Sequence, residues 1–150
     1  MNDADRKRLA DLEMREAARE VLFQYALGVD TRDFELLRRT FAEDVVFDRP
    51  PAEIQHGRDV AMAHYQSALP PEIDSMKHFI TNPTVMPTGD DTVSVHAYIL
   101  AVNEMGSALS MAWGQYRIKI RVDADGAVIT EMGIYLDKPA TPVRTMLGED

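Results

Sequence analysis

Histidine side chains are the residues of this chain best suited to acid–base chemistry, because an imidazole takes up or releases a proton near neutral pH. Among the four histidines of the sequence, His78 is set apart by its position. It shares strand parity with Met76 and Ile80 in an alternating stretch, which predicts a place on the inner face of a sheet. A polar ring there needs a hydrogen-bond partner or a cavity. The pattern therefore allows either a catalytic base or a structural histidine.

The other histidines fit structural positions. His56 adjoins a glycine turn, His64 lies among alanines on a predicted helix, and His96 alternates with small apolar residues in a predicted strand. We expect all of them to be surface or structural side chains.

Two groups near the end of the first predicted helix could act beside a base. Asp30 and Asp33 lie between two predicted helices, where short acidic side chains commonly cap a helix. We expect Asp33 to be such a cap, whereas Asp30 follows an apolar stripe and can either cap or point inward. Tyr25 lies on that stripe, so we expect its ring in the core and a partner for its hydroxyl.

The sequence lacks the usual signatures of metal and cofactor binding. It has no cysteine, which excludes thiolate metal sites, disulfides and cysteine nucleophiles. No His-x-x-x-His or Glu-x-x-His pair occurs on a predicted helix, and neither a glycine-rich phosphate loop nor a Gly-x-Ser-x-Gly elbow occurs. We expect a protein that needs neither a metal nor a cofactor.

The charge balance is wrong for a nucleic-acid binder. The chain has 16 Lys and Arg residues against 25 Asp and Glu residues, a net charge of −9, and binding to phosphate backbones needs a basic face. Residues 1–8 are charged and hold no signal-peptide core, and the apolar runs are too short to span a bilayer. We expect a cytoplasmic protein with no nucleic-acid or membrane partner.

Hydrophobic periodicity divides the chain into a helical first half and a β-rich second half. Helical spacing predicts a helix over residues 9–29 that stops near Gly28 and Asp30. It also predicts a shorter helix after Asp33, with Phe34, Leu37 and Phe41 on one face, and a helix over residues 58–68. Strands are predicted at residues 45–47, 76–85, 92–103, 108–122 and 127–136.

This order of elements predicts one α+β domain over residues 1–150, with N-terminal helices packed on a curved sheet. The turns between the last four strands are short, which favours an antiparallel sheet. A charged lead precedes the first helix, and the segment that holds Pro139 and Pro142 is expected to be a short tail.

Alternation in the strand over residues 108–122 separates an inner and an outer face. Tyr116 falls on the inner face and Arg117 on the outer one. Leu109, Met111 and Trp113 also have outer parity, and an apolar patch of this kind needs a cover, either another subunit or the tail. We favour a homo-oligomer, a dimer or a trimer.

Two short segments resemble a known family. Residues 22–33 (LFQYALGVDTRD) with residues 41–46 (FAEDVV), and residues 78–82 (HFITN), are similar to the SnoaL-like branch of the nuclear transport factor 2 superfamily. The resemblance extends over about residues 15–136. Within that branch the chain is most similar to the scytalone dehydratase, bile acid 7α-dehydratase and hexachlorocyclohexane dehydrochlorinase group.

This resemblance implies a cone-shaped α+β barrel with a deep apolar pocket. It also implies roles for three residues: His78 removes a proton from carbon, Asp30 orients His78, and Tyr25 assists the leaving group or carbonyl. A carboxylate on one imidazole nitrogen would fix the tautomer, and an apolar pocket would exclude water.

The sequence also departs from the group. In the strand after His78, where some relatives carry an ionisable group, Asn103 is the polar candidate at the pocket end. Some relatives have an arginine on or after the last strand, and Arg144 is the nearest substitute here. Tyr116 and Tyr135 are further candidates to supply hydroxyls for substrate binding.

These expectations favour a cofactor-independent lyase or isomerase with a His-Asp dyad. Its substrate would be a hydrophobic cyclic molecule: a steroid, a polyketide or an aromatic intermediate. The alternative is a small-molecule-binding or interaction module with the same fold and no chemistry, because one fold hosts many functions. A third interpretation, the small subunit of an aromatic dioxygenase, would require a large catalytic partner.

Overall fold

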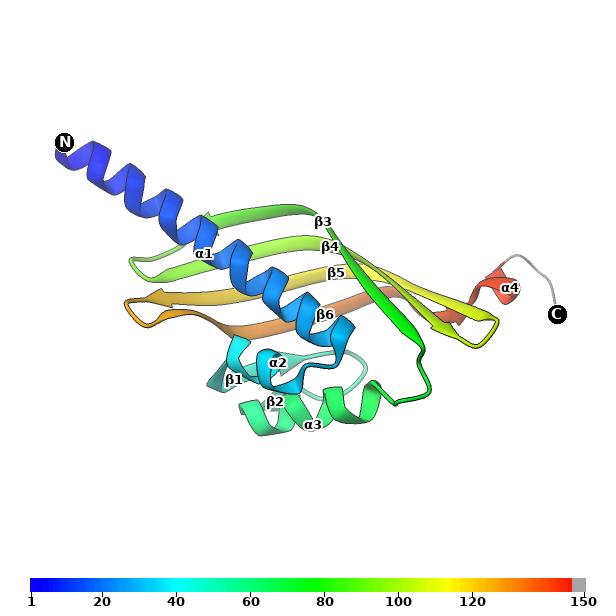
Figure 1. Cartoon of the computed structure of the whole chain (residues 1–150). Coiled ribbons are helices and arrows are strands. Elements are labelled where there is room, and N and C mark those ends of the chain that lie inside the picture. Colours follow the sequence, from blue (N-terminus) through cyan, green and yellow to red (C-terminus); the bar gives the residue numbers. More distant parts are fainter. Residues whose placement is uncertain (147–150) are drawn as a thin grey trace.

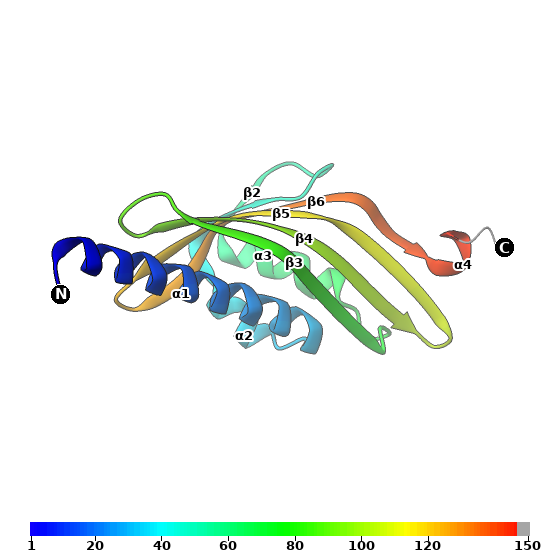
Figure 2. The same ribbon diagram turned by 90° about the horizontal axis from the view of Figure 1, so that it is seen from above.

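The helices lie along one face of a curved sheet (Figures 1 and 2). The structure is a computed structural model and describes residues 1–146. Its elements in chain order are α1 (Asp3–Thr31), α2 (Phe34–Thr40), β1 (Phe41–Asp48), β2 (Gln55–His56), α3 (Arg58–Ala68), β3 (Ser75–Pro87), β4 (Thr92–Met105), β5 (Ala108–Asp123), β6 (Gly126–Pro142) and α4 (Val143–Met146). None of the described helices is long and apolar enough to cross a membrane.

The sheet has six strands in the order β2-β1-β6-β5-β4-β3. Strands β3 to β6 form the predicted antiparallel meander. The prediction of a wholly antiparallel sheet is wrong in one place, because β1 pairs in parallel with β6. The sheet is therefore mixed. The sheet is curved, and α1, α2 and α3 lie on its concave side, as the view from above shows (Figure 2).

Helix α1 is longer than predicted at both ends. Its first turn is capped by the Asn2 side chain, which accepts a hydrogen bond from the Asp5 backbone amide. The helix continues to Thr31, past Gly28 and one residue beyond Asp30, where the stop was predicted. Gly28 serves close packing instead: a Cβ there would lie 3.0 Å from the Leu37 backbone nitrogen of α2.

The predicted cap of the second helix is confirmed. The Asp33 side chain accepts a hydrogen bond of 2.9 Å from the Leu36 backbone amide at the start of α2. Phe41, expected on this helix, is instead the first residue of β1. It stays fully buried, so the apolar pattern predicted its burial correctly but assigned it to a helix instead of a strand.

The predicted tail is the largest error in element bounds. Strand β6 runs on through Pro139 to Pro142, which pairs with Ser110 of β5. Proline removes one backbone donor and is tolerated where a strand has a neighbour on one side only. The described pairs between β1 and β6 end at Gly133, so this part of β6 meets that condition. Residues 147–150 of the expected tail lie outside the described part of the chain.

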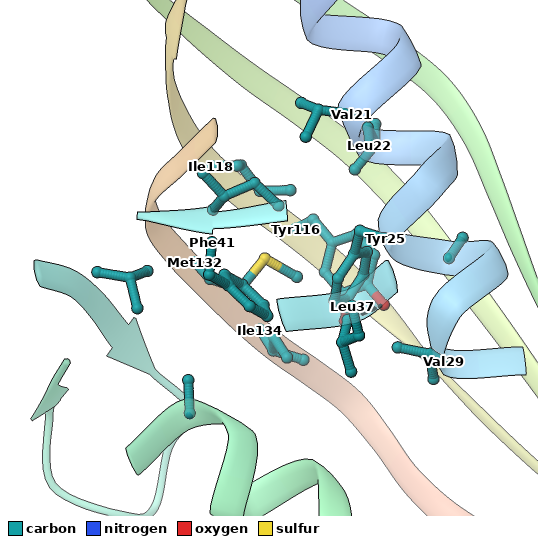
Figure 3. Close-up of a cluster of buried hydrophobic side chains, with 14 of the residues drawn as sticks. Val21, Leu22, Tyr25, Val29, Leu37, Phe41, Tyr116, Ile118, Met132 and Ile134 are labelled. Atoms are coloured by element: carbon teal, nitrogen blue, oxygen red, sulfur yellow. Dashed lines mark hydrogen bonds between the residues drawn. The ribbon is translucent and has the colours of Figure 1, made fainter. Parts of the chain in front are cut away.

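The core fills the space between α1, α2 and the concave face of the sheet. Figure 3 shows Leu22 and Tyr25 of α1 facing Tyr116 of β5, with Met132 and Ile134 of β6 beside them. The predicted parity of β5 is confirmed, because Tyr116 is buried while Arg117 is exposed. This packing fixes where the last turns of α1 lie over the sheet.

Candidate active site

Asp30 and His78 form a hydrogen-bonded pair where the last turn of α1 crosses β3. The Asp30 Oδ1 atom lies 2.6 Å from His78 Nδ1. The second carboxylate oxygen, Oδ2, accepts the His78 backbone N–H at 3.0 Å. Both oxygens of one carboxylate therefore hold one residue, and Asp30 points inward rather than capping a helix. The two side chains are 12% and 13% exposed for His78 and Asp30, respectively.

This arrangement assigns different tasks to the two ring nitrogens of His78. A carboxylate accepts hydrogen bonds and cannot donate one, so the neutral ring carries its proton on Nδ1. The Nε2 lone pair is then available, and no hydrogen bond within the described chain engages it. Since His78 lines a cavity, Nε2 belongs to the ring edge that can meet a ligand.

Three tyrosines form a hydroxyl cluster on the same cavity. The Tyr25 hydroxyl lies 2.9 Å from that of Tyr65 on α3 and 3.4 Å from that of Tyr116 on β5. Their rings meet edge to face around Tyr25. Burial raises the pKa of all three phenols above the usual 10.0, and the positive charge of Arg49 offsets part of this rise. They are therefore neutral hydrogen-bonding groups at neutral pH.

The cavity has a volume of about 180 Å³ and lies between the sheet, α1 and α3. His78, Asn103 and the three tyrosines are among its polar lining groups. Most of the remaining wall is apolar: Val29, Ala68, Leu69, Ile73, Met76, Ile99, Ala101, Ala112, Ile134, Leu136 and Ala140. An apolar wall with few polar groups is typical of sites for small organic ligands.

The structure brings together most of the site residues predicted from the sequence. Tyr25, His78, Asn103 and Tyr116 line the cavity, and Asp30 contacts His78 from behind. The Asn103 Oδ1 atom is buried and has no hydrogen-bond partner among the described residues. A ligand with a hydroxyl or N–H group could supply that missing donor.

Tyr135 lies elsewhere, so its predicted place in the pocket is wrong. In the sheet it stands opposite Gln115, on the outer face, and its hydroxyl donates to Asp48 at 2.5 Å. It lines a separate groove of about 710 Å³. The cause is an irregularity in the β5–β6 register between the Lys119–Glu131 and Ile120–Ile129 pairs, because one extra residue reverses strand parity. Arg144 is exposed on α4 and does not line the cavity.

Three cavity residues escaped the sequence reasoning: Arg49, His64 and Tyr65. His64, expected to be structural, lines the wall beside Phe47. Its burial, with the Arg49 charge as a second cause, lowers its pKa below the usual 6.5. Tyr65 follows the buried pair Ala61 and Met62 at helical spacing, a signal that could have found it. Among the described residues, no cluster of three or more His, Asp and Glu side chains could hold a metal ion.

One long and two shorter helices on the concave face of an open, curved six-stranded sheet, with an inner cavity, define a nuclear transport factor 2-like α+β cone fold. The particular family follows from the sequence match. The model of the SnoaL-like domain matches residues 10–133, and the chain belongs to this family. No curated protein matches the chain.

Several solved structures share the fold. One is a candidate scytalone dehydratase from Novosphingobium aromaticivorans, with 19% identity, a TM-score of 0.76, and 87% of each chain covered. Another is a hexachlorocyclohexane dehydrochlorinase from Novosphingobium barchaimii, with 17% identity, a TM-score of 0.76, and 94% of each chain covered. A third, a nuclear transport factor 2-like protein from N. aromaticivorans, is 24% identical with a TM-score of 0.72, covering 87% of this chain and 84% of that one. At these identities the likeness concerns the fold.

Proposed function

We propose that the protein is a cofactor-independent lyase or isomerase in which His78 removes a carbon-bound proton from a hydrophobic cyclic carbonyl compound. The observation that carries this proposal is the 2.6 Å contact between Asp30 Oδ1 and His78 Nδ1 beside a largely apolar cavity. The same contact leaves Nε2 without a partner in the described chain.

The chemistry begins with Nε2 of neutral His78. It takes the proton from the carbon next to a carbonyl, the C–H electron pair forms a C=C bond, and the carbonyl π pair moves to oxygen. Asp30 stabilises the imidazolium that results and holds its orientation. A positioned base of this kind contributes about 10²–10⁴-fold to a rate.

The enolate can then follow one of two routes. In a lyase the electrons return, a hydroxide leaves the neighbouring carbon, and a proton from the imidazolium converts it to water. In an isomerase the imidazolium returns its proton to a different carbon. Either route restores neutral His78, and both depend on the same first step. Similarity in fold to a candidate scytalone dehydratase and a dehydrochlorinase supports this class of reaction.

Solvent deuterium exchange tests the first step without knowledge of the final product. A panel of cyclic ketones is incubated with the protein in D₂O, and NMR follows deuterium incorporation next to the carbonyl. We expect exchange with the wild type and a loss of about 10²–10⁴-fold in His78→Gln. His96→Gln is the matched control, because His96 lies on the outer face and bonds Gln115 at 2.9 Å.

Two results would contradict the proposal. One is equal exchange by the wild type and His78→Gln. The other is tight binding of panel compounds with no exchange and no turnover, which would support the alternative of a binding module with the same cavity.

A further inference from the structure

The cavity carries a charge pattern that the Asp30–His78 pair does not explain. Arg49, in the segment between β1 and β2, lines its wall together with His64 and His78. No Asp or Glu side chain of the described residues is part of that wall. Although the whole chain has a net charge of −9, its ionisable groups in this cavity are basic residues and tyrosines. Such a lining suits an anionic ligand group.

Among the residues that the structure describes, Arg49 lacks the acidic partners that two nearby arginines have. Arg38 pairs with Asp59 at 2.6 Å, and Arg58 pairs with Glu43 at 3.2 Å. No ion pair or side-chain hydrogen bond involves Arg49 within the described part of the chain. Arg49 is half-buried as a residue, and its guanidinium has several N–H donors to satisfy. An apolar surrounding strengthens its attraction for an anion.

The tyrosine cluster has a hydroxyl proton to spare. Tyr25, Tyr65 and Tyr116 each carry one hydroxyl proton. The two hydrogen bonds that join them use one proton each, so one proton is left for an acceptor outside the cluster. The raised pKa values keep the cluster protonated at neutral pH, with burial as the main cause and Arg49 acting against it. The cluster is therefore a hydrogen-bond donor to a ligand.

The volume of the cavity corresponds to about one ring of a ligand. Its volume of about 180 Å³ is close to the roughly 150 Å³ of an engineered cavity that binds benzene. Sites for drug-sized ligands have volumes of about 300–1,000 Å³. About one substituted six-membered ring therefore fits inside this cavity.

We infer that Arg49 and the Tyr25–Tyr65–Tyr116 cluster form an oxyanion site for a single-ring carbonyl compound or phenolate. The catalytic role of this site rests on the proposed function, whereas its binding role does not. As His78 takes the proton from carbon, negative charge develops on the carbonyl oxygen. Arg49 and the spare tyrosine proton then stabilise that oxygen more strongly than they stabilise the neutral carbonyl.

The probe for this site is 4-nitrophenol, whose phenolate has its own absorption band. The protein is titrated into the probe at a pH at which the free phenol is mostly protonated, and the phenolate band is followed. We expect the wild type to bind the phenolate and to lower the apparent pKa of the bound probe. Arg49→Met should weaken phenolate binding about ten- to hundredfold, the range for losing a hydrogen bond to a charged group.

Matched variants separate this inference from a general loss of structure. Arg39→Met is the control, because Arg39 is exposed on α2. Arg49→Lys keeps the charge and should recover part of the phenolate binding that Arg49→Met loses. Circular dichroism and thermal melting establish that each variant is folded. The inference is wrong if folded Arg49→Met binds the phenolate as well as the wild type, or if the wild type binds only the neutral phenol.

A His78→Gln variant distinguishes failure of this inference from failure of the proposed function. Phenolate binding should persist in His78→Gln, because Arg49 supplies the positive charge. If the phenolate band instead depends on His78 and not on Arg49, the oxyanion site is refuted while His78 stays a proton acceptor. If the phenolate binds through Arg49 but no ketone exchanges its deuterium, the oxyanion site stands and the proposed function fails.

Discussion

Replacing Asp30 by asparagine preserves the shape of the side chain and reverses the role of one of its two polar atoms. The carboxylate accepts from the His78 ring at 2.6 Å and from the His78 backbone at 3.0 Å. An amide has one accepting oxygen and one NH₂ donor. If the oxygen keeps the backbone bond, the NH₂ group faces Nδ1. Nδ1 must then accept, and the imidazole proton moves to Nε2.

The opposite amide orientation is also unfavourable. The NH₂ group would then face the His78 backbone N–H, so that two donors meet and one of them loses its partner. An unsatisfied buried donor costs about 1–3 kcal/mol. We therefore expect the first orientation, with Nε2 protonated and unable to act as a base.

The expected loss of rate follows from the two tautomers of His78, because only the Nδ1–H tautomer has a free Nε2 lone pair. The same exchange of aspartate for asparagine in a Ser-His-Asp triad lowers the rate by about 10⁴-fold, and a general base contributes about 10²–10⁴-fold. We expect deuterium exchange to fall by about 10²–10⁴-fold in Asp30→Asn. Stability should fall by only about 1–2 kcal/mol, since neutral hydrogen bonds replace charge-assisted ones.

NMR of protein with ¹⁵N-labelled histidine measures the tautomer directly, without a substrate, and His78→Gln assigns the signals. We expect an Nδ1–H ring in the wild type and an Nε2–H ring in Asp30→Asn. Asp33→Asn is the control, because Asp33 only accepts the Leu36 backbone amide and asparagine can do the same. An unchanged tautomer in Asp30→Asn, with exchange retained, would refute the role of Asp30.

Two further predictions concern the tyrosine cluster and the outer face. Burial raises the pKa of Tyr116 above 10.0, so as the pH rises past that value the unfolded chain loses its tyrosine protons first and the free energy of unfolding falls. Urea midpoints measured across alkaline pH should fall less steeply in Tyr116→Phe than in the wild type, and equal slopes would contradict this. On the outer face, Phe79 and Trp113 are 50% and 42% exposed in the same row across the sheet, and we propose that a second copy of the chain covers them. Sedimentation should give Trp113→Glu a lower mass than the wild type. The control Leu27→Glu, on α1, should keep the mass of the wild type, and a monomeric wild type would disprove the interface.

The sequence was most informative where one physical rule decided the outcome. Alternation in β5 separated buried Tyr116 from exposed Arg117 because that strand has one apolar and one solvent-facing side. The bounds of α3 were predicted at Arg58–Ala68, as the structure has them. Its end is marked by prolines that cannot continue a helix. Local signals of this kind do not depend on distant parts of the chain.

Predictions failed where a distant element overrode the local signal. Gly28 looks like a helix stop, yet its lack of a side chain lets the Leu37 backbone approach within 3.0 Å of where a Cβ would be. The parallel pairing of β1 with β6 joins segments far apart in the chain, and a short apolar strand gives no indication of its partner. In both cases tertiary packing, rather than propensity, determined the structure.

The candidate site shows the same division between local and distant information. The inward parity of His78 was visible in the sequence, but only the fold brings Asp30 to it across 48 positions. Strict alternation from buried Ile129 would put Tyr135 inside the sheet. The register irregularity next to Ile129 moves it outside and leaves Met132 and Ile134 buried instead.

Electrostatics in the cavity could not be inferred from the composition at all. Net charge sums every side chain of the molecule. A ligand in a cavity responds mainly to the few charged groups close to it, because water screens those groups least. This chain is acidic overall, yet Arg49 is the permanently charged group among the described residues of the cavity wall. The acidic side chain next to this wall, Asp30, is engaged twice by His78, so it presents no free carboxylate to the cavity. A protein that is acidic overall can thereby have a cavity wall whose charged side chains are basic.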